Sequence, residues 1–292
     1  IRHLPQMRDY DVVQVTNPVF FDLRPEKNWA IFKYLKKHNK KIFLDALAID
    51  HYYVKACLDG KTFRYSDFFV GDRPLPHPER EKMLAAWIGG PNERPNIEMA
   101  QEANGIIACL YEYYAAYQPE YADKLAYIPI PIDLSINPFH PIKSTPEVVK
   151  FFIGIQQHRT AIKGTDILLD VLREIHDKYP RESHIQKVVS VPLDEYNKLL
   201  VDCHILLDQL YSYTPATNAL AAMARGIIAV SGAEPEFYNF IGEQKLRPII
   251  NVLPDRNDIF KQLENLIIHR DQLPRLSTES RQFVEKYHDH VK

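Results

Sequence analysis

The chain has 292 residues, of which 46% are hydrophobic and 25% charged, and its 36 basic and 38 acidic side chains leave a net charge of -2. At roughly 100–200 residues per domain, this length favours two domains. Near-neutrality removes the general positive field that non-specific nucleic-acid binding requires, so no nucleic-acid partner is expected. No apolar run reaches the roughly 18–20 residues of a membrane span, and no signal-peptide layout opens the chain, so we expect a soluble protein without a transmembrane segment.

The three cysteines, Cys57, Cys109 and Cys203, stand far apart and form no C-x-x-C pair. They predict neither a disulfide framework nor a cysteine zinc site, and this usage indicates a reducing, cytoplasmic location. The sequence also lacks the glycine-rich dinucleotide fingerprint and the P-loop. The pair His288 and His290 suggests a metal, but adjacent positions near a terminus are more often an exposed helix end. We therefore expect no metal and no cofactor.

Short apolar runs alternate with stretches of helical period, which predicts βα units and largely parallel sheets. In the first half, a helix is expected over 26–38, where apolar residues recur at helical spacing. Residues 73–94 mix prolines, charges and one apolar patch, which predicts a loop or an interrupted region. The strands expected in this half are Asp11–Val15, Lys41–Leu44, Gly105–Cys109 and Leu125–Ile130.

Five prolines between residues 129 and 146 interrupt every periodic pattern, and such a stretch sustains neither a helix nor a central strand. We therefore place the domain boundary in this region, with domains over 1–140 and 141–292. Beyond it the alternation restarts. The strands expected there are Val148–Ile155, Ile185–Val191, His204–Leu207, Ile227–Ser231 and Pro248–Val252; the helices are Thr165–Lys178, Leu193–Val201, Pro215–Arg225 and two more starting at Asp258 and Thr278.

The most informative stretch runs from residue 204 to residue 232. A strand ends at Asp208, a polar and aromatic loop follows, and Thr214 and Pro215 predict an N-cap and a first helical residue. Gly226 is expected to end this helix. Helix N-termini at the carboxyl end of a parallel sheet attract anions, so the amides around 216–218 are candidates for a diphosphate site. The alternative is an ordinary capped helix, since every βα unit has one.

Two basic residues strengthen the prediction of an anion site at this end of the sheet. Arg159 and Lys163 fall in the loop and first turn beyond the expected strand Val148–Ile155. Fixed cations beside an open helix N-terminus would neutralise a diphosphate well. The alternative is a solvated loop with ordinary surface charges.

These segments resemble a known family. Residues 153–169 (IGIQQHRTAIKGTDILL) and 202–238 (DCHILLDQLYSYTPATNALAAMARGIIAVSGAEPEFY) are similar to the donor-binding domain of GT-B glycosyltransferases of the retaining "group 1" type. Arg159 and the pair Lys163-Gly164 match the family's arginine and Lys-Gly pair. The helix and strand ALAAMARGIIAVS and the turn AEPEFY match two further motifs. The resemblance covers residues 147–292 well and the first domain only loosely, through FLDALAIDHYY and YIPIPID.

The resemblance implies an α/β fold with two Rossmann-like parallel-sheet domains facing an interdomain cleft. It implies transfer of a sugar from a nucleotide diphospho-sugar to an unknown sugar, glycan or lipid-linked acceptor, with retention and without an essential metal. The second domain would bind the donor, and the first would serve the acceptor, although its usual first strand and glycine-rich loop are missing. Peripheral membrane contact stays open. The residues implied at the donor diphosphate are Arg159, Lys163, Gly164, Thr214, Thr217 and Asn218.

The sequence departs from the family at its acids. The family carries two glutamates eight residues apart, which contact the donor sugar and the ribose, and these positions hold Tyr213 and Ala221 here. An active chain then needs another acid, and Asp208, Glu234 and Glu236 are nearest in sequence. We assign Asp208, Tyr213 and Glu234 to the donor sugar or ribose.

We expect Glu236 to be a catalytic residue, because its A-E-P-E turn matches the family's donor-sugar turn. A second catalytic candidate is Asp50, which occupies the acid of a His-Gly-x-Asp-like segment whose histidine is replaced by Leu47. The alternative function is a catalytically idle relative that binds a nucleotide or glycan as a scaffold. A sugar-nucleotide epimerase of the same architecture is disfavoured, because the matched helix and strand motif is of transferase type.

Overall fold

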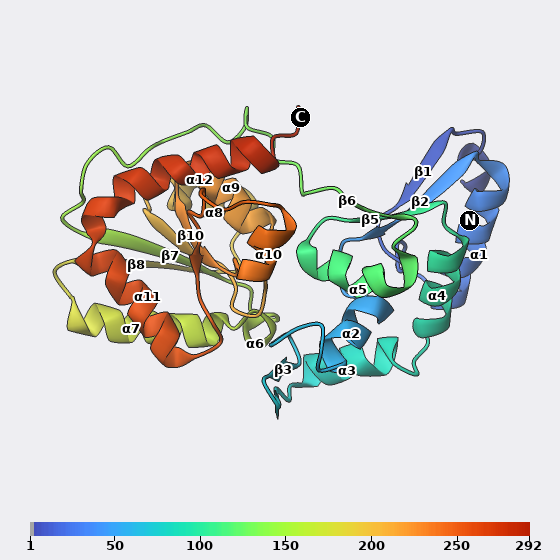
Figure 1. Cartoon of the computed structure of the whole chain (residues 1–292), viewed down its shortest axis with the longest axis horizontal. Helices are drawn as coiled ribbons and strands as arrows, with labels where there is room; N and C mark the ends of the chain where they lie inside the picture. Colours follow the sequence, from blue (N-terminus) through green and yellow to red (C-terminus); the bar gives the residue numbers. More distant parts are fainter. Residues whose placement is uncertain (1–2) are drawn as a thin grey trace. The chain divides into compact units, whose positions relative to one another are not determined.

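The computed structural model describes residues 3–292, which form two compact units divided after Pro129. Each unit contains its own parallel sheet and its own helices (Figure 1). None of the helices in the described residues is long and apolar enough to cross a bilayer.

The first unit is built on a four-stranded parallel sheet with the order β1-β2-β5-β6. Its strands are β1 (Val12–Val15), β2 (Lys41–Ala46), β5 (Gly105–Ala108) and β6 (Leu125–Tyr127). They differ from the expected strands by a few residues at their ends. The core lies where Ile42 and Leu44 of β2 and Ile106 of β5 meet Phe32, and all four side chains are fully buried.

The helices of the first unit are α1 (Pro25–His38), α2 (His51–Leu58), α3 (Pro78–Trp87), α4 (Glu93–Glu102) and α5 (Tyr111–Tyr121). Helix α1 confirms the helix expected from the apolar spacing. The region 73–94, which has no clear period, contains α3 and the start of α4, and a short hairpin of β3 (Phe69–Val70) and β4 (Arg73–Pro74) precedes them. A 3-10 turn, Leu4–Gln6, stands before β1.

The second unit is built on a five-stranded parallel sheet with the order β11-β10-β9-β7-β8. Its strands are β7 (Val149–Ile155), β8 (Ser183–Val189), β9 (Ile205–Leu207), β10 (Ile228–Ser231) and β11 (Ile250–Asn251). All five match strands expected from the sequence. Because β8 and β9 pair with opposite edges of β7, the winding of the sheet reverses at β7.

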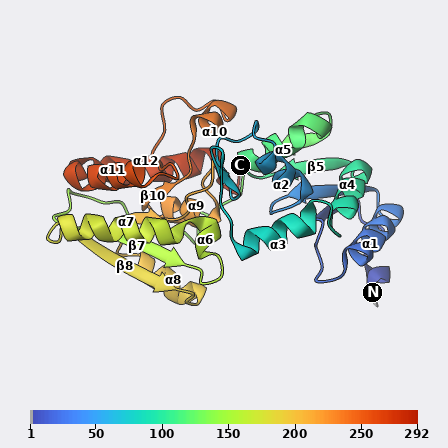
Figure 2. The ribbon, with the colours of Figure 1, turned by 90° about the horizontal axis from the view of Figure 1, so that it is seen from below.

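Helices cover both faces of this sheet, with α7 and α11 on one face and α9 and α12 on the other (Figures 1 and 2). Two-sided cover is what a parallel sheet with continuous apolar strands requires. The helices are α6 (Thr160–Lys163), α7 (Thr165–Lys178), α8 (Leu193–Leu200), α9 (Thr217–Ala224), α10 (Pro235–Phe240), α11 (Arg256–Ile268) and α12 (Leu273–Tyr287), with a 3-10 turn at Arg270–Gln272.

The division between the units falls after Pro129, so residues 130–140, which the sequence analysis assigned to the first domain, belong to the second. The reason is a set of bonds to the end of the chain and to α9. The Ile132 amide donates to the His288 carbonyl at 2.6 Å, and the Arg225 guanidinium donates to the Asn137 side chain at 3.0 Å. Prolines mark a break in periodicity, but these tertiary bonds decide which core the segment joins.

Candidate functional site

A cavity of about 430 Å³ lies at the carboxyl ends of β7 and β8 in the second unit. Its lining is mixed: apolar side chains and strand backbone form one part, and a lysine, two amides, a serine hydroxyl and a phenol form another. Open α/β sheets bind ligands outside the carboxyl ends of their strands, at the point where the winding reverses. The lining residues are Gly154, Ile155, Gln156, Lys163, Val188, Ser190, Val191, Leu193, Tyr196 and Asn218.

The winding of this sheet reverses at β7, so the loops after β7 and after β9 leave in different directions from neighbouring strands. The segment after β7 carries Lys163, the last residue of α6, and the loop after β9 begins at Asp208 and leads into α9. Both loops contribute to the polar part of the site.

Lys163 and Asp208 meet in this crevice. The Lys163 Nζ atom lies 3.7 Å from Asp208 Oδ1, and the side chains are 20% and 2% exposed. The second carboxylate oxygen of Asp208, Oδ2, is buried and has no hydrogen-bond partner within residues 3–292. A buried carboxylate oxygen without a donor is unusual in a folded protein, because leaving it unpaired costs free energy.

Asn218, in the first turn of α9, links this pair to the aromatic part of the cavity. Its Nδ2 donates to Asp208 Oδ1 at 2.9 Å, and its Oδ1 accepts from the Tyr196 hydroxyl at 2.9 Å. The Tyr196 ring packs edge-on against Phe152, with ring centroids 4.9 Å apart. Burial raises the pKa of Tyr196 to about 12, so its hydroxyl keeps its proton as a donor at neutral pH.

Helix α9 begins at Thr217 with Ala216 as its N-cap, and this corrects the prediction of a Thr214 cap and a Pro215 start. Residues 210–215 form instead a buried loop, in which Thr214 is 1% exposed and the Tyr213 carbonyl accepts from the Glu234 amide at 3.0 Å. The first backbone N–H groups of a helix have no partner within it. The N–H groups at the start of α9 that lack a partner within the helix are therefore those of Thr217, Asn218 and the residue that follows.

Two glycines have backbone conformations that matter here, Gly164 in the crevice and Gly226 at the other end of α9. Gly164 has a φ of +67° between α6 and α7, and a Cβ there would stand 2.7 Å from the Leu210 Cβ atom. The loop after β9 thus packs directly on Gly164, and the Leu210 amide donates to the Lys163 carbonyl at 2.9 Å. Gly226, with a φ of +88°, follows the C-cap of α9, as the sequence predicts.

The other residues expected at the diphosphate lie around the same loops. Arg159 is exposed in the turn after β7, and its carbonyl accepts from the Lys163 amide at 2.9 Å. Thr217 is exposed at the start of α9, whereas Thr214 is buried in the loop before it. Of the residues assigned to the diphosphate, only Lys163 and Asn218 line the cavity.

The acids of the A-E-P-E turn lie at the start of α10. Glu234 is 1% exposed, and its Oε1 accepts from the Asn251 side chain at 2.9 Å. Glu236 is half-buried in the first turn of α10. Tyr213, at one position of the absent glutamates, is 2% exposed. Neither acid lines the cavity beside Lys163, whereas Asp208 forms an ion pair with that lysine.

Asp50 belongs to the first unit, where it caps α2. Its Oδ1 accepts from the Tyr53 amide at 2.9 Å and its Oδ2 from the Tyr117 hydroxyl at 2.7 Å, and the residue is fully buried. Burial raises its pKa to about 6, against the lowering effect of these two bonds. These contacts give Asp50 a structural role as the cap of α2, and its catalytic role stays a prediction.

Other candidates also have structural partners. His288 is 4% exposed, and its Nδ1 lies 2.9 Å from the Ile130 carbonyl. Within residues 3–292, no group of three or more His, Cys, Asp or Glu side chains is arranged to hold a metal ion. The three cysteines are buried and unpaired, and burial raises the pKa of Cys203 to about 11.

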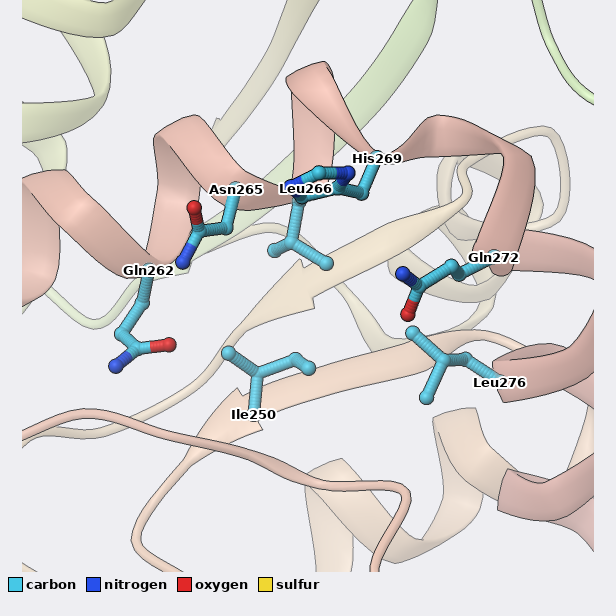
Figure 3. Close-up of a pocket in the computed structure, with 7 residues that line it drawn as sticks. All are labelled: Ile250, Gln262, Asn265, Leu266, His269, Gln272 and Leu276. Atoms are coloured by element: carbon cyan, nitrogen blue, oxygen red, sulfur yellow. The ribbon is translucent and has the colours of Figure 1, made fainter.

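A smaller cavity of about 230 Å³ lies at the edge of the second unit, between β11 and the helices α11 and α12. Figure 3 shows three amide side chains, Gln262, Asn265 and Gln272, around an apolar patch. Its lining contains no lysine, arginine, aspartate or glutamate, and no residue predicted for the donor site lines it. Nothing in it matches a diphosphate.

Three residues that line the cavity were not predicted from the sequence: Tyr196, Ser190 and Gln156. Ser190 adopts a φ of +47°, its amide donates to the Ile155 carbonyl at 2.9 Å, and its hydroxyl accepts from the Gln157 amide at 3.2 Å. It thereby joins the ends of β7 and β8. A non-glycine residue with positive φ has no signal in the sequence, although its place just after a strand could have drawn attention.

Neither a family model nor the sequence of a curated protein matches this chain. Among solved structures, HepE (Alr3699) of Anabaena in complex with UDP and glucose aligns at a TM-score of 0.62 and 12% identity, over 99% of this chain and 77% of that one. Sucrose-phosphate synthase from Thermosynechococcus elongatus aligns at 0.60 and 13% identity, over 96% and 70%. WaaG, a glycosyltransferase involved in lipopolysaccharide biosynthesis, aligns at 0.54 and 14% identity, over 94% and 82%.

These likenesses extend over nearly the whole chain, and they agree with the two parallel-sheet units described above. The chain therefore has an α/β fold of the GT-B type, with two Rossmann-like domains, as its structural neighbours among the glycosyltransferases do.

Proposed function

We propose that this protein is a glycosyltransferase that moves a sugar from a nucleotide diphospho-sugar to an acceptor hydroxyl, with retention at the anomeric carbon and without an essential metal. The donor binds in the second unit, in the cavity at the ends of β7 and β8. The solved structures of HepE contain UDP, glucose or UDP-glucose, which supports a donor of this class.

The observation that carries this proposal is the place of Lys163. Its ammonium group borders the cavity at the reversal of the sheet, beside the N-terminal turn of α9. A fixed cation and a helix N-terminus together suit a diphosphate, because both oppose its negative charge. The apolar side chains of Ile155, Val191 and Leu193 suit the flat face of a nucleobase.

The chemistry follows from this arrangement. Sugar transfer breaks the bond between the anomeric carbon and the diphosphate oxygen, so negative charge grows on the leaving diphosphate. Lys163, Arg159 and the amides of Thr217 and Asn218 would stabilise that charge. The acceptor hydroxyl forms the new bond and releases its proton, and the departing diphosphate can accept this proton.

An acid near the donor sugar completes the proposal. Sugar and ribose hydroxyls lose water on binding and need acceptors. We assign this contact to Glu236, half-buried at the start of α10, with Glu234 and Asp208 as the other carboxylates of this end of the sheet. Glu236→Gln keeps the shape and removes the charge, so it should retain nucleotide binding and lose donor turnover. Wild-type turnover in this variant would remove the assignment.

A second candidate function is a catalytically idle relative that binds a nucleotide or glycan as a scaffold. One observation favours it: Tyr213 and Ala221 occupy the positions of the two family glutamates, and Tyr213 is packed away from solvent. Such a protein would bind the nucleotide and leave the donor unchanged.

A panel of UDP-, GDP-, ADP- and dTDP-sugars separates these functions. A ligand at 100 times its Kd adds about 2.7 kcal/mol to stability, so the matching donor should raise the melting temperature. Lys163→Met should weaken binding by about 2 kcal/mol, roughly thirtyfold. The control is Lys178→Met on the same unit, whose lysine pairs with Glu264 at 2.6 Å. Donor turnover then identifies an enzyme, and binding without turnover identifies the scaffold. No binding by any nucleotide contradicts both the enzyme and a nucleotide-binding scaffold, and leaves only a scaffold that binds a glycan.

A further inference from the structure

Asp208 stands out among the residues around the cavity, because it is a buried negative charge at a place that suits an anionic ligand. Its side chain is 2% exposed, and Oδ2 has no hydrogen-bond partner in the part of the chain that the structure describes. Burying a carboxylate costs free energy, so the contacts of Asp208 with its neighbours should show what offsets that cost.

Two neighbours hold it in place. Asn218 donates to Oδ1 at 2.9 Å, and the Tyr196 hydroxyl in turn fixes the Asn218 amide at 2.9 Å, so the amide has one orientation. The Asp208 amide also donates to the Val230 carbonyl at 3.0 Å, which ties the residue to the sheet. The position of the Asp208 carboxylate is therefore fixed by the sheet and by the Asn218 side chain.

Lys163 has the longer and more flexible side chain of the pair. A lysine side chain has about 2 kcal/mol of rotamer entropy and a compact charge that no fork geometry orients. Its ammonium group lies 3.7 Å from Asp208 Oδ1 and borders the cavity, whereas the carboxylate does not line the cavity. A ligand in the cavity meets the lysine first, and the carboxylate lies behind it.

We propose that Asp208 is a positioning residue: it holds the Lys163 ammonium at the edge of the cavity, so that a nucleoside diphosphate finds this cation already in place. This inference rests on the proposed function for its ligand. The benefit is preorganisation, since a side chain that is ordered before binding loses less entropy on binding. Asp208 acts on the ligand only through Lys163.

The test is a double-mutant cycle on the full chain, with affinities for a nucleoside diphosphate and for its parent nucleoside measured by calorimetry. Asp208→Asn removes the charge and keeps an oxygen for Asn218. It should weaken diphosphate binding by about tenfold, as loss of one charge-assisted arrangement does, and leave nucleoside binding unchanged. In a Lys163→Met background the same change should have no further effect, because its partner is gone.

Two results in the cycle would overturn the proposal. Additive effects of the two substitutions would mean that Asp208 does not act through Lys163. Tighter diphosphate binding by Asp208→Asn would mean that the carboxylate only repels the ligand. The matched control is Glu264→Gln, which breaks a carboxylate, lysine and tyrosine cluster at the far end of α7, with Lys178 Nζ at 2.6 Å and the Tyr179 hydroxyl at 2.7 Å, and should leave both affinities unchanged.

A second measurement needs no ligand. Nitrogen-15 relaxation of the lysine ammonium groups in the free protein should show Lys163 ordered in the wild type and mobile in Asp208→Asn, whereas Glu264→Gln should mobilise Lys178 alone. Equal mobility of Lys163 in the wild type and Asp208→Asn would overturn the positioning role. An ordered Lys163 in a protein that binds no nucleotide would uphold that role and contradict the proposed function, so the two failures are distinguishable.

Discussion

Lys163 and Asp208 come from the loops after two neighbouring strands, β7 and β9, and their side chains meet with Nζ 3.7 Å from Oδ1. The winding of the sheet reverses between these strands, so the pair lies where the fold itself leaves a crevice. The same end of the sheet contains the cavity and the first turn of α9. The fold thus brings one cation, one anion and an open helix end together from three separate segments.

The first prediction concerns the glycine that lets the loops after β7 and β9 approach each other. Gly164→Ala should destabilise the protein by about 2 kcal/mol or more, because alanine is strained at a φ of +67° and its Cβ would overlap the Leu210 side chain at 2.7 Å. Gly242→Ala is the control, since its φ is +70° but nothing lies within 4 Å. Urea unfolding should show a loss of about 1 kcal/mol for the control. Equal losses in both variants would mean that the overlap has no effect.

The second prediction concerns pH. Burial lowers the pKa of His288 to about 4, against a usual value of 6.5, so the native protein keeps this ring neutral. The unfolded chain takes up the proton first as the pH falls. The contribution of His288 to the free energy of unfolding is therefore fully present above pH 6.5. It falls by about 3 kcal/mol as the pH drops from 6.5 to 4. His288→Asn, which keeps a donor for the Ile130 carbonyl, should flatten the stability curve over this range.

His290 provides the control for that measurement, because its side chain is 41% exposed. His290→Asn should leave the slope of unfolding free energy against pH as in the wild type. If the unfolding free energy of His288→Asn has the same slope against pH as that of the wild type, protonation of this ring does not cause the loss of stability in acid.

The third prediction concerns the structural role of Asp50 as the cap of α2. Asp50→Ala should cost about 1 kcal/mol or more, because it removes the cap on α2, whereas Asp50→Asn keeps an oxygen for the Tyr53 amide. Burial raises the pKa of Asp50 from 3.8 to about 6, so in the wild type this group lowers stability as the pH rises from 3.8 to 6. Asp50→Asn should abolish this loss of stability between pH 3.8 and 6. Thermal unfolding at a series of pH values measures it, and an unaltered pH dependence would contradict the assignment.

The fourth prediction concerns the shape of the cavity. Gly154 lies at the end of β7, and a Cβ there would stand 2.6 Å from the Tyr196 ring. Gly154→Ala should displace this ring, release its hydroxyl from Asn218 and weaken nucleotide binding. Gly105→Ala is matched, since its Cβ would stand 2.6 Å from the Phe43 ring in the first unit. Calorimetry should show weaker binding for Gly154→Ala alone, although both variants lose stability; an unchanged affinity would remove Tyr196 from the site.

Much of the second unit could be predicted from the sequence. Helix α7 has the expected bounds, Thr165–Lys178, because its apolar residues keep a strict helical period and its ends stand beside a glycine and a lysine. Gly226 ends α9 as expected, because a left-handed residue after a helix is usually glycine. Local patterns of this kind determine local structure.

Tertiary contacts decided what the sequence could not show. The pair Thr214-Pro215 has the composition of a helix start, yet the loop packs into the core and α9 begins at Thr217. Asp50 matches a family acid by position, yet Tyr117, 67 residues further along the chain, occupies its carboxylate. The pairing of Asp208 with Lys163 likewise depends on strand order, which no local pattern records.

Amide chemical-shift mapping during titration with the best nucleotide of the panel shows whether a nucleoside diphosphate binds in the cavity of the second unit. We expect the largest shifts on residues after β7 and β8 and at the start of α9, such as Lys163, Ser190 and Asn218, and smaller shifts in Lys163→Met. Shifts confined to the smaller cavity around Gln262 and Gln272, or to residues 3–129, would contradict this expectation.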